Sequence, residues 1–330
     1  MSQRTPEAKV ESLRDHVSRL RKALATSIVG QADTVDGVLV ALLAGGHVLL
    51  EGVPGLGKTR LVRSLASTIS LEFSRIQFTP DLLPSDVIGA NVLVEGRGDA
   101  RIEFRKGPVF TNVLLADEIN RATPKTQSAL LEAMQERSVT VAGRTERLPD
   151  PFLVLATQNP LEMEGTYPLP EAQLDRFLLK LLVPFPTREE LRSILAMTTG
   201  GEEAKITPCL DAATLDELRA TVRSIAVAEP MIDYVVRLIE ATHPERSEAT
   251  ERVKRYVRYG SSPRGAQSLL LAAKVRAAMD GRFAVASKDV RESLKPALRH
   301  RIILGFEGEA DGIDRDSLLD DVIDAIKEKR

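Results

Sequence analysis

The segment GVPGLGKT at 52–59 has the residue types of a loop that holds phosphates. It follows the apolar stretch HVLL and precedes a helical pattern that begins near Arg60. Glycines let the backbone curl around an anion, and consecutive N–H groups at a helix N-terminus add positive potential. Lys58 would reach the β- and γ-phosphates of a nucleotide, and the Thr59 hydroxyl would hold Mg²⁺. The predicted binding residues are Gly52, Val53, Pro54, Gly55, Leu56, Gly57, Lys58 and Thr59, the alternative being a glycine-rich turn without a ligand.

Two carboxylates end the apolar stretch NVLLAD at 112–117. Open sheets of parallel strands place their ligands at the carboxyl ends of the strands, which is where Asp117 and Glu118 stand. We expect Asp117 to help hold Mg²⁺ and Glu118 to polarise an attacking water or accept its proton. Taken alone, the pair is equally compatible with a turn that carries two solvated acids. The phosphate loop upstream favours the chemical interpretation.

A third strand pattern, FLVLATQNP at 152–160, ends in an amide pair. The Asn159 side chain offers both a donor and an acceptor, so it could hydrogen-bond a γ-phosphate or the lytic water. Its alternative is an ordinary Asn-Pro turn.

Two arginines complete the set of candidate catalytic residues. Arg176 is expected to lie beyond the last core strand, near the predicted domain boundary, where a guanidinium could meet phosphate oxygens only if they belonged to a neighbouring subunit. Arg264 stands in a Ser-Pro-Arg-Gly turn at the start of a helical segment, and could swing onto the γ-phosphate when a small domain closes. For both residues the alternative is an ordinary ion pair.

The elements that must position these residues form an α/β fold. Short apolar strands alternate with helices, of which Arg60–Ile69 and Lys125–Gln135 are the clearest, so residues 1–185 should form an open parallel sheet covered by helices. Beyond Leu182 strand patterns stop and helical periodicity continues to an acidic C-terminal segment. We therefore predict a P-loop core at 1–185 and a smaller all-helical domain at 186–330. Strand-turn-strand patterns at 92–104 and 139–148 predict two hairpins on the core surface.

Composition narrows the choice of partners. The chain has 330 residues, with 45 Lys and Arg against 47 Asp and Glu, a net charge of -2 that argues against a general affinity for nucleic acid. The only cysteine is Cys209, which excludes an internal disulfide and fits a reducing cytoplasm. The longest nearly apolar stretch, Gly37 to Leu50, falls short of the ~20 residues that span a bilayer, so we expect no membrane insertion.

Longer strings in the sequence resemble one family of proteins. The order GVPGLGKT, ADEIN, ATQNP, LDRF at 174–177 and SPRG at 262–265 is similar to that of AAA+ ATPases. QFTPDLLPSDVIG at 77–89, ADEINRA at 116–122 and GTYPLPEAQLDRF at 165–177 resemble the MoxR family in particular. The resemblance runs from IVGQ at 28–31 to the acidic segment, and no motif position departs from it.

The resemblance implies roles for individual residues. It implies a Walker A motif ending in Lys58 and Thr59, a Walker B motif with Asp117 and Glu118, and sensor 1 at Asn159. Arg176 matches the arginine finger, and Arg264 matches the sensor 2 arginine of a helical lid domain.

The same resemblance implies a Mg²⁺-dependent ATPase that works as a ring, with six subunits expected. It also implies chaperone-like remodelling or metal-centre maturation, with a partner that carries a von Willebrand factor A domain. Two alternatives stay open: a motor that acts on nucleic acid, and a switch that binds ATP without hydrolysing it. Related rings place hairpins like the two predicted here toward their pore or client.

Overall fold

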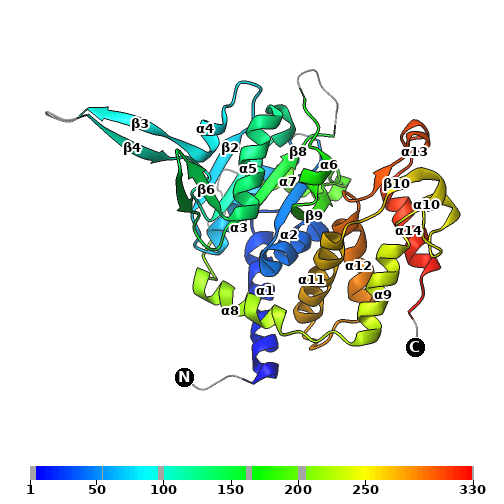
Figure 1. Cartoon of the computed structure of the whole chain (residues 1–330). Coiled ribbons are helices and arrows are strands. Elements are labelled where there is room, and N and C mark those ends of the chain that lie inside the picture. Colours follow the sequence, from blue (N-terminus) through cyan, green and yellow to red (C-terminus); the bar gives the residue numbers. More distant parts are fainter. Residues whose placement is uncertain (1–4, 54, 96–99, 161–165, 200–205, 329–330) are drawn as a thin grey trace.

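A five-stranded parallel sheet forms the core of the protein, as its computed structural model shows (Figure 1). The structure describes residues 5–53, 55–95, 100–160, 166–199 and 206–328. The strand order is β2-β5-β8-β1-β9, and every neighbouring pair is parallel, which confirms the predicted open α/β sheet. The strands are β1 (His47–Glu51), β2 (Phe73–Gln77), β5 (Val113–Asp117), β8 (Leu153–Gln158) and β9 (Phe177–Leu182).

Alternate residues of the central strands pack into two separate hydrophobic clusters, one on each face of the sheet. In β1, Val48 and Leu50 belong to the larger cluster while Leu49 belongs to the smaller one. In β5, Leu115 and Leu114 divide in the same way. Successive side chains of a strand point to opposite faces, so strands that are apolar on both faces must be covered twice.

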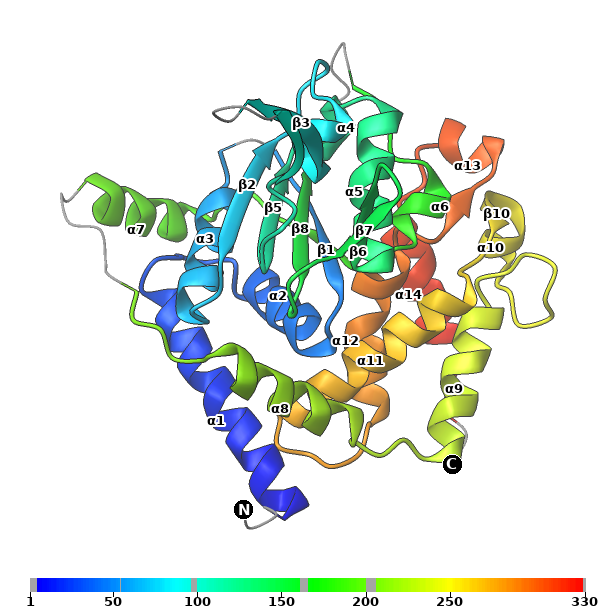
Figure 2. The same cartoon turned by 60° about the vertical axis from the view of Figure 1, so that its left-hand side comes forward.

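Helices cover both faces of this sheet (Figure 2). The larger cluster contains the buried faces of the first three helices and the smaller one those of the next two. In chain order these helices are α1 (Pro6–Ala25), α2 (Ala32–Ala44), α3 (Lys58–Thr68), α4 (Pro84–Ile88) and α5 (Pro124–Glu136). The predicted helices at 60–69 and 125–135 are therefore confirmed as α3 and α5.

The second half of the chain is helical, as predicted, and it packs along the edge strand β9. Its buried residues continue the larger cluster, so the sheet and the helical domain share one apolar core. A short ladder between β10 (Val257–Tyr259) and β11 (Ile303–Leu304) is an addition to the predicted helices. The helices are α6 (Glu171–Leu174) before β9, then α7 (Arg188–Thr199), α8 (Ala212–Arg223), α9 (Glu229–Glu240), α10 (Glu251–Tyr256), α11 (Pro263–Met279), α12 (Ser287–Leu298), α13 (Phe306–Ala310) and α14 (Arg315–Ala325).

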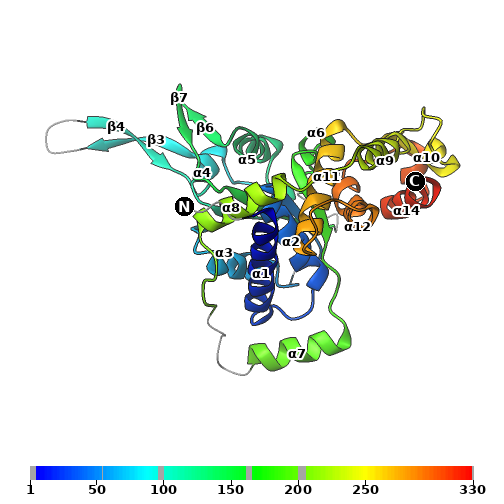
Figure 3. The same ribbon diagram turned by 90° about the horizontal axis from the view of Figure 1, so that it is seen from below.

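Helix α7 stands apart from the rest of the protein (Figure 3). None of its residues is buried, although Leu191 and Leu195 lie on it. It begins with a capping box, in which the Thr187 N–H donates to Glu190 and the Glu190 N–H donates to Thr187 Oγ1. Over the described ranges, none of the helices has the length and apolar character needed to cross a membrane.

Both predicted hairpins are present on the core. Strands β3 (Gly89–Glu95) and β4 (Ala100–Lys106) pair antiparallel and project from one end of the molecule (Figure 1). Residues 96–99 at their tip lie outside the described residues. The second hairpin pairs β6 (Ser138–Val141) with β7 (Arg144–Arg147), directly before β8.

Candidate functional site

The phosphate loop joins β1 to α3 at the carboxyl edge of the sheet. Gly55 and Gly57 have φ angles of 85° and 76°, a backbone conformation that L-residues rarely adopt. A Cβ atom at either position would meet nothing within 4 Å, so both glycines face open space rather than packed side chains. Pro54, which was predicted to belong to the loop, lies outside the described residues. The described part of the loop therefore fits a group that binds through backbone N–H donors.

The Lys58 side chain is buried at the base of this loop. Its Nζ donates to the Gly52 carbonyl oxygen at 2.6 Å, and only 8% of the residue is exposed. Burial lowers the pKa of Lys58, while the carboxylates of Asp117, Glu118 and Glu51 act against that lowering. An ammonium group near three carboxylates, with a loop carbonyl as its hydrogen-bond acceptor, is well placed to exchange that carbonyl for a phosphate oxygen.

Asp117 and Glu118 follow one another at the end of β5, beside the phosphate loop. The Thr59 hydroxyl lies 3.5 Å from Asp117 Oδ2. Thr157 on the neighbouring strand fixes both acids, because its Oγ1 donates to Asp117 Oδ1 at 2.6 Å and accepts from the Glu118 N–H at 2.8 Å. Glu118 itself has a φ of 56°, so the chain turns sharply there and directs the two carboxylates differently.

Three side chains that the sequence analysis did not assign to the site hold these carboxylates. Arg75 on β2 forms an ion pair of 2.7 Å with Asp117 Oδ2. Gln77, two residues further along β2, donates to Glu118 Oε2 at 3.0 Å, and Arg121 contacts the same oxygen at 3.1 Å. The signal that could have found Arg75 and Gln77 is their alternate spacing at the end of a strand adjacent to β5, but the sequence FSRIQ is too polar to be recognised as a strand.

Asn159 directly follows β8, so it lies at the same carboxyl edge as the two acids. Its carbonyl oxygen accepts from Asn120 Nδ2 at 3.3 Å, which ties the end of β8 to the short helix after Glu118. Lys58, Thr59, Asp117, Glu118 and Asn159 thus all come from the same edge of the sheet, as predicted from their places at strand ends.

Arg176 and Arg264 lie at the other end of the parallel strands, where the strands begin. This amino-terminal edge of the sheet, with its two arginines, is called the arginine edge below. Arg176 immediately precedes β9, whose first residue pairs with His47 at the start of β1, whereas the phosphate loop follows the end of β1. Five residues of β1 separate the two edges, which at ~3.3 Å per residue is about 16 Å. The expectation that Arg176 follows the last core strand is therefore wrong: β9 was missed, and it comes after Arg176.

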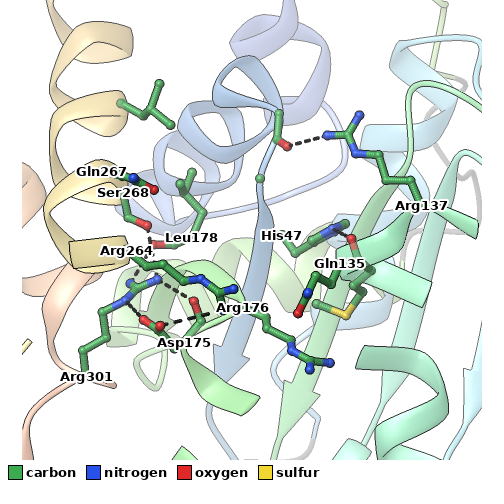
Figure 4. A pocket seen from close by; sticks show the side chains of 14 residues that line it. His47, Gln135, Arg137, Asp175, Arg176, Leu178, Arg264, Gln267, Ser268 and Arg301 are labelled. Carbon is green, nitrogen blue, oxygen red and sulfur yellow. Dashed lines mark hydrogen bonds and ion pairs between the residues drawn. The ribbon is translucent and has the colours of Figure 1, made fainter. Parts of the chain in front are cut away.

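Arg264 lies beside Arg176 rather than beside Lys58 (Figure 4). Both arginines line a cavity of about 330 Å³, together with His47, Gln135 and Arg137. Arg264 Nη1 lies 4.0 Å from Asp175 Oδ2, whereas the Arg176 guanidinium forms no hydrogen bond or ion pair with any residue that the structure describes. The expected swing of Arg264 onto its own chain's γ-phosphate disagrees with this arrangement, because the helical domain packs along β9 and holds α11 at the far edge.

Comparisons with known proteins agree on one family. A family model described as the ATPase family associated with various cellular activities (AAA) matches residues 47–179, and a model of the AAA lid domain matches residues 249–322. Chaperone MoxR1 of Mycobacterium tuberculosis is 44% identical over 97% of this chain and 85% of its own length. The chain belongs to the MoxR family of AAA+ ATPases.

Other similarities to this MoxR-family chain extend over nearly its full length. Protein MoxR of Methylorubrum extorquens is 33% identical over 91% of each chain. A crystal structure from Cytophaga hutchinsonii, of a protein assigned as an ATPase, has 39% identity and a TM-score of 0.91, covering 98% of this chain and 97% of that one. The core sheet with a C-terminal helical lid is therefore shown by both the fold and the relatives, and the helical domain is called the lid below.

The residues of the MoxR-family site suit a nucleotide and Mg²⁺. Two glycines with positive φ leave room for phosphates, and a buried ammonium group stands at the base of their loop. A hydroxyl and a carboxylate, Thr59 and Asp117, supply the oxygen ligands that Mg²⁺ prefers. No group of three or more His, Cys, Asp or Glu side chains gathers elsewhere in the described part of the chain to suggest another resident metal.

Proposed function

We propose that this protein is a Mg²⁺-dependent ATPase whose active site is shared between two subunits of a ring. One subunit contributes the phosphate loop, Asp117, Glu118 and Asn159, and its neighbour contributes Arg176 and Arg264. A closed ring is the proposed assembly, because a head-to-tail contact of this kind leaves no free surface only when every subunit both gives and receives it. Six subunits is the number that the family resemblance implies.

A single observation carries this proposal: the two arginines and the phosphate loop stand at opposite edges of one sheet. A separation of about 16 Å exceeds the reach of an arginine side chain, and β1 and β9 are rigid hydrogen-bonded strands between the two edges. Both arginines line a cavity, and the Arg176 guanidinium has no partner among the described residues. An anion supplied by a second subunit would give both groups a partner.

Each residue of the phosphate-loop side has a distinct task in the proposed reaction. Lys58 releases the Gly52 carbonyl and binds the β- and γ-phosphates. When bound, Mg²⁺ would be held through Thr59 and Asp117 and would neutralise charge that develops on the phosphate oxygens. Glu118 orients the attacking water or accepts its proton, which requires its carboxylate to leave Gln77 and Arg121. The Asn159 side chain would hydrogen-bond the γ-phosphate and would lose that partner on hydrolysis.

We further propose that hydrolysis remodels partner proteins through the β3–β4 hairpin. Leu93 and Ile102 stand directly opposite one another in its register, and they are 64% and 71% exposed. An apolar pair on a projecting hairpin suits contact with a protein client. The β6–β7 hairpin directly precedes β8, so a displacement of Asn159 could be transmitted to it through that strand.

The proposed partner is a protein with a von Willebrand factor A domain, and assembly or metal-centre maturation in the cytoplasm is the proposed task. The name of one relative, Chaperone MoxR1, supports this class of work. A pull-down with Glu118→Gln, which should hold ATP and client together, tests it. Lys58→Ala is the matched control, because it should retain no client through ATP.

The structure disfavours a motor that acts on nucleic acid. The basic segment at 251–260 gives two of its arginines to acids of the C-terminal segment: Arg252 pairs with Asp321 and Arg255 with Glu307. Arginines in ion pairs offer less charge to a phosphate backbone. The intact Glu118 disfavours a switch that never hydrolyses ATP.

The direct test is ATP turnover as a function of protein concentration. Specific activity should rise with concentration as rings form, and Arg176→Ala should bind ATP normally while turnover falls by roughly 10³–10⁵. Arg21→Ala is the control, because the Arg21 side chain is 43% exposed and, among the residues that the structure describes, forms its ion pair with Asp36 on the neighbouring helix. Activity that is independent of concentration, or full turnover by Arg176→Ala, would overturn the shared site.

A further inference from the structure

We infer that Asp175 is a positioning residue that ties the lid to the arginine edge and fixes Arg176 and Arg264 relative to each other. The inference rests on the proposed function, in which those arginines serve the neighbouring subunit. Asp175 directly precedes Arg176 and lines the same cavity, but its carboxylate is bound by Arg301 and Ser262 of the lid. It acts through the groups that its carboxylate gathers from two segments of the lid (Figure 4).

The first of these segments is the start of α11. Ser262 is the N-cap residue of that helix, and its hydroxyl lies 2.9 Å and 3.1 Å from the two carboxylate oxygens of Asp175. Arg264 Nη1 lies 4.0 Å from Asp175 Oδ2. The carboxylate therefore anchors the first turn of α11, and with it the backbone that carries Arg264, to the residue before Arg176.

The second segment follows α12 and carries Arg301, whose side chain is only 2% exposed. Its Nε donates to Asp175 Oδ1 at 2.7 Å. Its Nη2 donates to the carbonyl oxygens of Asp175 at 2.9 Å and of Phe177 at 2.8 Å. Arg301 thus binds the backbone on both sides of Arg176, which limits the directions that the Arg176 side chain can take.

Electrostatics make this contact dependent on the carboxylate. Burial lowers the pKa of Arg301, and the hydrogen bond and charge of Asp175 act against that lowering. Asp175 is the only acid with which Arg301 forms an ion pair within the described residues. Removing one partner of a buried ion pair leaves the other charge uncompensated, so the lid segment would have to move toward water.

The consequence is a link between lid position and catalysis in the adjacent subunit. A shift of the lid relative to β9 must pull on Arg301 and Ser262, and through Asp175 on the segment that bears Arg176. The two arginines would then move as one unit. ATP binding, which uses the opposite edge of the same chain, should be left unchanged.

The test compares Asp175→Asn with Asp316→Asn. Asp316 is a matched control, because its side chain is 19% exposed, as that of Asp175 is, and it also forms an ion pair of 2.7 Å with an arginine. That arginine, Arg299, also donates to a carbonyl oxygen of β9. That carbonyl belongs to Lys180, away from Arg176. We expect Asp175→Asn to keep its ATP affinity within about twofold and lose at least about tenfold in turnover, whereas Asp316→Asn keeps turnover within about threefold.

Mixed rings then separate positioning from general damage. Asp175→Asn chains mixed with Lys58→Ala chains should recover turnover, because the Lys58→Ala chains supply an intact arginine edge to the intact phosphate loops. Asp175→Asn mixed with Arg176→Ala should not recover, since both chains lack a working arginine edge. If Asp175→Asn does not fold, Ser262→Ala takes its place with a smaller loss and the same pattern of recovery.

Three results would overturn the inference. The first two are wild-type turnover by Asp175→Asn and an equal loss of turnover in Asp316→Asn. The third is that Asp175→Asn mixed with Lys58→Ala does not recover turnover, although Arg176→Ala mixed with Lys58→Ala does. That last mixture distinguishes the two proposals. If it fails to recover in rings shown to be mixed, the shared active site is wrong and the positioning role falls with it.

Discussion

The buried histidine at the start of β1 should make the protein lose stability in mild acid. His47 is buried between the sheet and α5, where its Nε2 lies 3.2 Å from the Met134 carbonyl oxygen and its Nδ1 lies 3.0 Å from the Val154 N–H. Since an N–H must donate to Nδ1, the ring is neutral with its proton on Nε2. Burial lowers the pKa of His47 from 6.5 to about 4, and the nearby charges of Arg137 and Arg219 contribute to the lowering.

The size of the effect follows from this difference in pKa. Between pH 6.5 and pH 4 the unfolded chain binds a proton at His47 that the folded chain does not bind, so the free energy of unfolding falls as the pH falls. At 1.36 kcal/mol for each pH unit, the full difference amounts to about 3 kcal/mol. The loss should begin just below neutral pH and should be nearly complete at pH 4.

Urea unfolding at several pH values between 7 and 4 measures this loss. His47→Gln is the comparison, because an amide can still donate to Met134 and accept from Val154 while it cannot be protonated in this range. His300, whose pKa burial also lowers, is present in both proteins, so its contribution cancels in the difference. The wild type should lose about 3 kcal/mol more than the variant between pH 7 and pH 4. Parallel curves for the two proteins would refute the reasoning.

Three further predictions concern the site and the working surface. Lys58→Ala should abolish ATP binding in a fluorescent-nucleotide titration, whereas Glu118→Gln should bind ATP without hydrolysing it, because only Lys58→Ala removes a phosphate ligand. Tight ATP binding by Lys58→Ala would contradict the assignment. Arg75→Ala should lower the Mg²⁺ concentration for half-maximal ATPase activity by about two- to fivefold, because it frees Asp117 from a half-exposed ion pair, and an unchanged or higher concentration would count against it. Replacing Leu93 and Ile102 together by serine should keep basal ATPase activity within about twofold while removing its stimulation by a partner, and full stimulation would show that the β3–β4 hairpin is not the client surface.

Much of the fold could be predicted from periodicity alone. Residues 60–69 and 125–135 were expected to be helical and form α3 and α5, because each has apolar residues on one face that pack against the sheet. The buried strands β1, β5 and β8 were recognised because they are apolar on both faces. The two edge strands β2 and β9 were missed: β2 carries polar residues that serve the site, and β9 begins at the last residue of the LDRF string without a turn signal before it.

The candidate site likewise contains residues that could be predicted to lie together and residues that could not. Lys58, Thr59, Asp117, Glu118 and Asn159 could be grouped beforehand because parallel strands bring their carboxyl ends together. The residues that surround Arg264 could not be predicted, because they depend on how the lid packs against β9. That packing is decided by contacts between residues more than a hundred positions apart, such as Arg301 with Asp175. Local sequence patterns carry no information about such contacts.

The most direct test of the shared site is ATP turnover in rings that mix Arg176→Ala with Lys58→Ala at varied ratios. Each variant alone should be inactive, the first for want of the neighbour's guanidinium and the second for want of phosphate binding. In an equal random mixture about a quarter of the interfaces would join an intact phosphate loop to an intact arginine edge, so turnover should pass through a maximum there. A maximum at the equal mixture is the predicted result. No turnover at any ratio, in rings shown to contain both chains, would contradict a site built from two subunits.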